Sequence, residues 1–98
     1  MKIDLKKVLF NEDGEDFTIG ETKEKVTFGY IFTKALLTEL KGDEEKVEDK
    51  GKRFTLWYEK LKDKKEAELT IEESVMIKER VGKAFGAIIY GQISLVLK

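Results

Sequence analysis

The chain contains no cysteine among its 98 residues, and this absence constrains its fold more than any other feature. Without cysteine there is no disulfide scaffold, so an apolar core has to hold the chain together. Apolar residues make up 41% of the sequence, which is enough for a thin core. A chain of this length fits one domain and leaves no room for two, so we expect residues 1–98 to form a single domain.

Histidine is also absent, which limits the chemistry that the chain can perform. The two absences remove the commonest general base, the thiol nucleophile and the two commonest transition-metal ligands. Ser-His-Asp triads, Cys-His sites and zinc fingers are therefore impossible. We predict that the protein is not an enzyme and uses no cofactor.

Charge is abundant but nearly balanced. Charged residues make up 40% of the chain, against roughly 25% in ordinary globular domains. Because 19 basic and 20 acidic residues give a net charge of −1, no global attraction to nucleic acid or anionic membrane is expected. Residues 1–7 lack the apolar stretch of a signal peptide, and the apolar run 84–97 is shorter than the roughly 20 residues that span a bilayer. We expect a cytoplasmic protein without a membrane partner.

An N-terminal hairpin is predicted from two β-prone runs, residues 3–10 and 15–19. Asp13-Gly14 between them indicates a type I′ turn, which needs positive φ at both central residues. The carboxylates at this tip could hold Ca²⁺ or Mg²⁺ through oxygen ligands. They match no EF-hand pattern, however, so we interpret them as a solvated acidic turn and expect no metal. These carboxylates belong to Glu12, Asp13, Glu15 and Asp16.

Apolar residues recur at three- and four-residue spacings in residues 28–40, which predicts a helix with one buried face. Thr27 is in position to cap its start, and Gly42 is in position to end it. The residues of this face are Phe28, Ile31, Phe32, Ala35, Leu36 and Leu40.

A second helix is predicted after Asp43, which caps it, with Glu44 and Glu45 in the first turn. A glycine inside a helix costs about 1 kcal/mol relative to alanine. We therefore expect a neighbouring element to pack closely against Gly51. The predicted core stripe of this helix consists of Val47, Gly51, Phe54, Tyr58 and Leu61.

A third helix begins at Thr70, which forms a capping box with Glu73. Gly82 and Gly86 are spaced to let two helices approach closely, and we favour two helices of one chain over two subunits. The predicted core residues of the third helix are Ile71, Val75, Met76, Val81 and Ala84.

Residues 87–97 fit a helix or a strand equally well, and residues 66–69 fit a short third strand or an extended connection. The elements together predict an α+β fold, in which the N-terminal hairpin, with or without that third strand, packs on about four helices. Residues 85–97 are apolar on nearly all sides, which predicts weak self-association through them.

One stripe of the second helix combines cations with an aromatic ring, and it is the candidate partner-binding site. In one interpretation the tryptophan covers the edge of the core while the basic heads remain in water. In the others the stripe binds a protein partner, or tracks a phosphate backbone and stacks a base. The stripe consists of Lys50, Arg53, Trp57, Lys60 and Lys64.

Residues 69–92 resemble small proteins encoded by tailed phages and prophages. The resemblance rests on Leu69-Thr70-x-x-Glu73, Ile77-Lys78-Glu79, Val81-Gly82-Lys83-x-Phe85 and Gly91-Gln92. It implies a helical final segment and assigns no catalytic residue, because the function of most such proteins is unknown. We predict an accessory protein that binds a host or phage protein, or a second copy of itself. Nucleic-acid binding through the basic stripe is the alternative.

Overall fold

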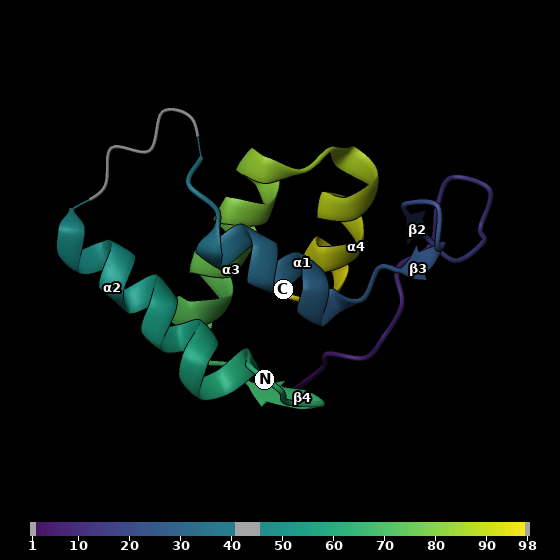
Figure 1. The fold of residues 1–98 in the computed structure, drawn as a ribbon. Helices are drawn as coiled ribbons and strands as arrows, with labels where there is room; N and C mark the ends of the chain where they lie inside the picture. Colours follow the sequence, from purple (N-terminus) through teal and green to yellow (C-terminus); the bar gives the residue numbers. More distant parts are fainter. Residues whose placement is uncertain (1, 41–45, 98) are drawn as a thin grey trace.

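The computed structural model describes residues 2–40 and 46–97 (Figure 1). Gly42, Asp43, Glu44 and Glu45, to which the sequence assigns helix ends, lie outside these ranges. The described helices are α1 (Phe28–Leu37), α2 (Val47–Leu56), α3 (Ile71–Ala84) and α4 (Ala87–Val96), with a π-helical turn, η1 (Trp57–Leu61), that continues α2. The described strands are β1 (Lys2–Asp4), β2 (Thr18–Ile19), β3 (Glu24–Lys25) and β4 (Glu66–Glu68). The predicted α+β fold is confirmed.

The N-terminal strand pairs with the middle of the chain. β1 runs antiparallel to β4, with Ile3 opposite Ala67. These two central residues are buried while their neighbours along each strand are exposed, which is the two-residue period of a half-buried sheet. The possible third strand at residues 66–69 is therefore present as β4. It pairs with β1, for which the sequence predicted residues 15–19 as the partner.

The acidic tip is a tight turn of a different type from the one predicted. Positive φ occurs at Gly14, at 80°, but not at Asp13, so the type I′ assignment is wrong. The Gly14 N–H donates to the carbonyl of Asn11 at 3.0 Å, and the Asn11 N–H donates to Glu15 at 2.7 Å. This is a three-residue loop that ends in a left-handed glycine. The Asn11 side chain favours it by accepting from the backbone of Asp13 and Glu15.

A second small hairpin follows the acidic tip along the chain. β2 pairs antiparallel with β3, with Thr18 opposite Lys25. Gly20 and Lys23 both have positive φ and close the turn between the strands. In Figure 1 this hairpin and the acidic tip extend on the opposite side of the molecule from α2.

α1 is the central helix and packs against α2, η1 and α3. All of its predicted apolar face is buried except Leu40, which lies beyond the helix end at Leu37. Thr27 caps the start, as predicted, by accepting from the Tyr30 N–H at 3.2 Å. A side chain at Gly29 would place its Cβ 3.0 Å from the carbonyl oxygen of Leu5, so glycine lets α1 approach the N-terminal segment.

The predicted capping box begins α3. The Thr70 hydroxyl accepts from the Glu73 N–H at 3.1 Å, and the Glu73 carboxylate accepts from the Thr70 N–H at 2.8 Å. The predicted core face is wrong at both of its ends, because Ile71 is 82% exposed and Val75 and Ala84 are exposed. Two polar residues, Ser74 and Arg80, lie on the face of α3 that is buried. Arg80 can be buried because its side chain donates to the Ala35 carbonyl at 2.6 Å. The buried residues of α3 are Ser74, Ile77, Arg80 and Val81.

The final segment is helical, in agreement with the resemblance. A Cβ at Gly82 would lie 3.3 Å from the ring of Tyr90, so the close approach predicted at Gly82 joins α3 to α4 within one chain. The prediction is wrong at Gly86, which precedes α4 and where an added Cβ would meet no described residue within 4 Å. Three large apolar residues of α4 are exposed, so the predicted self-association of residues 85–97 stays a prediction. They are Ile88, Tyr90 and Leu95.

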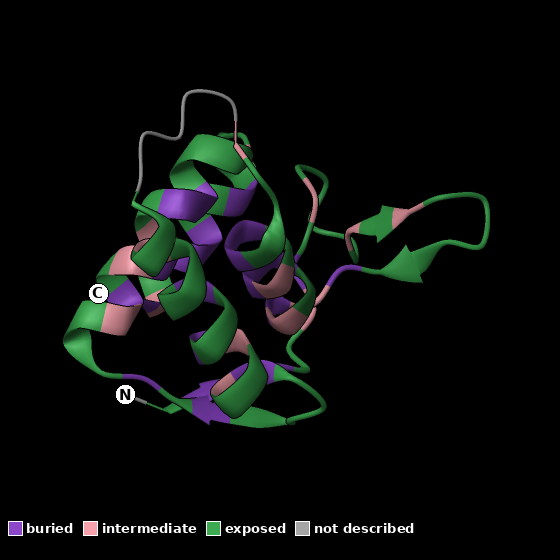
Figure 2. Cartoon of the chain, turned by 60° about the vertical axis from the view of Figure 1, so that its left-hand side comes forward, coloured by how far each residue is buried: buried purple, intermediate pink, exposed green. Residues whose placement is uncertain are grey.

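The core lies where α1 meets η1, α3, α4 and the β1–β4 sheet. In Figure 2 the buried residues line the inward faces of the helices and the short sheet, whereas the β2–β3 hairpin is mostly exposed. The largest fully buried side chains are Phe32, Ile3, Leu9, Ile31, Leu36, Ile77, Ile93 and Leu97.

Candidate functional site

The buried side of α2 and η1 contains part of the predicted basic stripe, whereas most of the predicted core stripe faces solvent. Val47 is 84% exposed, Phe54 52% and Tyr58 55%, whereas Leu61 is buried. The predicted core stripe is therefore wrong at every apolar residue except Leu61. The buried face of this helix contains Arg53, Leu56 and Leu61 instead.

Arg53 accounts for this orientation. Only 4% of the residue is exposed, and its Nη1 donates to the Leu36 carbonyl at 2.6 Å. Leu36 lies in the last turn of α1, where carbonyls lack helical partners and the helix dipole is negative. The guanidinium therefore binds the end of α1, and this contact draws the Arg53 side of α2 inward.

The other members of the basic stripe also make contacts within the chain. Lys50 pairs with Glu39 at 3.5 Å, and Lys60 pairs with Glu73 at 2.5 Å. Trp57 is half-buried and packs against the core. Lys64 is exposed and lines a surface pocket. The structure thus brings most of the stripe onto α1 and α3, and partner binding through it stays a prediction.

The ion pair of Lys60 affects the ionisation of its partner. Desolvation by burial raises the pKa of Glu73, but hydrogen bonds from Lys60 and Thr70 and the positive charge of Lys60 outweigh it. The net result is a pKa for Glu73 below its ordinary value of 4.5. Glu73 therefore joins the start of α3 to η1 as a carboxylate.

The outward stripe of Val47, Gly51, Phe54 and Tyr58, here named the outer ridge, is the largest feature that the sequence reading missed. The rings of Phe54 and Tyr58 stack with centroids 5.8 Å apart. The Lys62 ammonium lies 5.1 Å from the centre of the Tyr58 ring. A Cβ at Gly51 would meet nothing within 4 Å, so the close neighbour predicted there is absent from the described residues.

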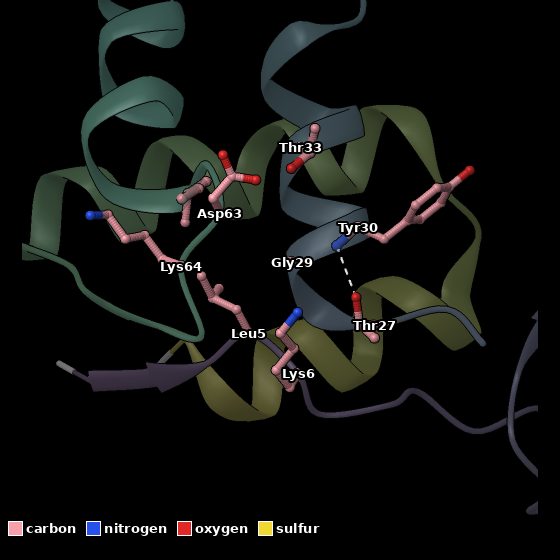
Figure 3. Close-up of a pocket in the computed structure, with 9 residues that line it drawn as sticks. Leu5, Lys6, Thr27, Gly29, Tyr30, Thr33, Asp63 and Lys64 are labelled. Carbon is pink, nitrogen blue, oxygen red and sulfur yellow. Dashed lines mark hydrogen bonds between the residues drawn. The ribbon is translucent and has the colours of Figure 1, made fainter. Parts of the chain in front are cut away.

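A surface pocket of about 310 Å³ lies between η1, the N-terminal segment and the start of α1 (Figure 3). Asp63, one of its lining residues, has a left-handed backbone with φ of 56°. In Figure 3 the Tyr30 and Lys64 side chains point outward on opposite sides. The first amides of α1 do not face an anion here, because Phe28 and Gly29 donate to the carbonyls of Lys7 and Leu5. The pocket is lined by the charged residues Lys6, Asp63 and Lys64, but its backbone amides do not converge on a site for a ligand.

A second contact missed by the sequence reading joins the N-terminal segment to α4. Gln92 is buried, and its amide accepts from the Phe10 N–H at 3.0 Å and donates to the Phe10 carbonyl at 2.8 Å. The two bonds satisfy both backbone polar groups of Phe10, which also forms an isolated antiparallel bridge with Asp16. Phe10 itself remains half exposed beside Leu95 at a pocket of about 100 Å³.

The acidic tip remains a solvated turn. Its four carboxylate residues are exposed, and Asp16 pairs with Lys25 at 3.1 Å. In the described part of the chain, no group of three or more acidic residues is placed to hold a metal ion. Within residues 2–40 and 46–97, no helix has both the length and the apolar character needed to cross a membrane.

No protein-family model, no curated protein and no solved structure matches this chain. The resemblance of residues 69–92 to proteins of tailed phages therefore stays a prediction.

Proposed function

We propose that the chain is a small phage or prophage accessory protein, which acts in the host cytoplasm by binding another protein through the outer ridge. The observation that carries the proposal is the exposure of Phe54 and Tyr58 on one face of one helix. Burial of apolar surface drives folding, so intrachain packing offers no reason to leave both rings in water. Aromatic side chains are enriched at the centres of protein–protein interfaces.

The ridge is also held rigidly. Arg53, Leu56 and Leu61 fasten the opposite side of the helix to the core. The stacked rings of Phe54 and Tyr58 further restrict one another. A surface that is ordered before it binds loses less conformational entropy on binding, which favours affinity.

Nucleic-acid binding receives less support. Strand binding needs cations along a groove and aromatic faces on which bases stack. Arg53 is committed to the end of α1, Lys60 to Glu73, and Trp57 packs on the core. The stripe that motivated this alternative is therefore largely occupied by the protein itself.

Affinity capture from a host-cell lysate that also contains untagged copies of this chain tests the proposal. We expect wild-type protein to retain a partner that the Phe54→Ser/Tyr58→Ser double variant loses, while the variant unfolds within about 1 kcal/mol of wild type because both rings are exposed. Ile71→Ser is the control, since Ile71 is an apolar residue on another helix that is even more exposed than Phe54 and Tyr58. Equal capture by wild type and the double variant would contradict the proposal.

A further inference from the structure

We infer that the outer ridge pairs with the outer ridge of a second copy of this chain, as two antiparallel helices in which Phe54 of each copy lies over Gly51 of the other. The inference rests on the proposed function and names the partner of the same surface. Three observations carry it: the unexplained glycine, the spacing of the ridge residues, and the rings that the fold leaves uncovered.

Gly51 has no evident use within residues 2–40 and 46–97. It lies in the interior of α2, where glycine is a poor helix former. Its backbone does not have positive φ, and an added Cβ would touch nothing within 4 Å. Because residues three and four apart share a helix face, the bare position lies between Val47 and Phe54 on the ridge. A helix from outside can approach closely at such a position.

The spacing along the ridge makes it complementary to itself. In an antiparallel pair related by a two-fold axis, residues with a common midpoint lie opposite one another. Gly51 and Phe54 share a midpoint between residues 52 and 53, and so do Val47 and Tyr58. Each large ring is therefore opposite a smaller residue of the other copy. A parallel pair would instead place glycine against glycine and ring against ring.

The contact between the two copies is apolar, because the charged residues beside the ridge already have partners within their own chain. Lys50 is already paired with Glu39, and Lys62 already lies over Tyr58. No ion pair between copies is part of the arrangement, so we expect the association to persist at high salt. The ridge from residue 47 to 58 is only about 18 Å long at 1.5 Å per residue. Such an interface is small, so the pair is weak and depends on concentration.

Sedimentation velocity over a range of protein concentrations tests the pairing. We expect wild type to shift toward a dimer. Gly51→Gln should remain a monomer, because its side chain takes the space of Phe54 of the other copy, and should melt at a higher temperature, because glutamine is a better helix former than glycine. Thr55→Gln introduces the same side chain on an exposed position outside the ridge and should dimerise like wild type. A wild type that is monomeric at every concentration overturns the inference, and so does a dimer that Leu95→Gln dissociates and Gly51→Gln does not.

Cysteine cross-linking tests the orientation, since the natural chain has no cysteine to interfere. A mixture of Val47→Cys and Tyr58→Cys proteins should form the mixed disulfide dimer in preference to either homodimer. Preferential homodimers would overturn the antiparallel arrangement. The lysate capture separates this inference from the proposed function: a monomeric wild type with ridge-dependent capture rejects only the second copy, and capture that ignores the ridge rejects the proposed function.

Discussion

Arg53 shows how a single residue decides which face of a helix is buried. A stripe containing arginine and lysines is ordinarily interpreted as solvated, because cations are almost never buried without a partner. Here the partner is the Leu36 carbonyl in the last turn of α1, with Glu39 nearby at 3.9 Å. The spacing of apolar residues in α2 gave no indication of this acceptor, which belongs to another helix. The residues of the basic stripe could therefore be identified from the sequence, but whether they face the core or solvent could not.

We expect Arg53→Ala to lower the free energy of unfolding by about 2–3 kcal/mol, since a hydrogen bond from a charged donor is lost and a buried carbonyl is left unsatisfied. Urea denaturation measures this change. Lys52→Ala, on the exposed side of the same helix, is the control and should change the stability by less than about 0.5 kcal/mol. Similar losses in the two variants would mean that Arg53 does not anchor α2.

At the scale of elements, the buried face of a helix was predicted correctly where the sequence allows only one way of packing it, and incorrectly where it allows several. α1 has one apolar face, and nearly all of it was predicted. α2 has two candidate faces, and the more apolar one proved to be the outer ridge. Residues 87–97 are apolar on most sides, so periodicity alone did not separate helix from strand. Local rules performed best where they act alone, as in the capping box of Thr70 and Glu73.

The start of α3 should give the protein a pH-dependent stability. The pKa of Glu73 is lower in the folded chain than its ordinary value, so its contribution is present above that value and is lost as the pH falls through the folded pKa. Glu73→Gln should therefore be less stable than wild type at neutral pH, and the difference should shrink below a pH of about 4.5. Thermal melts across pH measure this, with Glu72→Gln, an exposed neighbour, as the control. A difference that is constant with pH would exclude the ionised pair as its source.

At the scale of the whole molecule, long-range contacts attach the N-terminal segment to elements much later in the sequence. β1 pairs with β4 far along the sequence, and Gln92 holds Phe10. The predicted hairpin is present only around its tip, where Phe10 bridges Asp16, because β1 itself pairs with β4 instead of with residues 15–19. Strand partners at such separations leave no trace in turn chemistry. Composition and periodicity thus predicted the α+β class, but not the strand order or which face of α2 is exposed.

This arrangement predicts two levels of stability within one chain. The β2–β3 hairpin consists of two residues per strand, three of them exposed, and extends away from the helices (Figure 1). α1 is surrounded by buried side chains of other elements. Amides of residues 18–25 should therefore exchange with solvent through local opening, whereas amides in the middle of α1 should exchange only when the whole chain unfolds. Hydrogen exchange followed by NMR in increasing low concentrations of urea distinguishes the two, because only exchange through global unfolding accelerates steeply with denaturant. Equal protection and equal urea dependence in the hairpin and α1 would show instead that the hairpin is an integral part of the core.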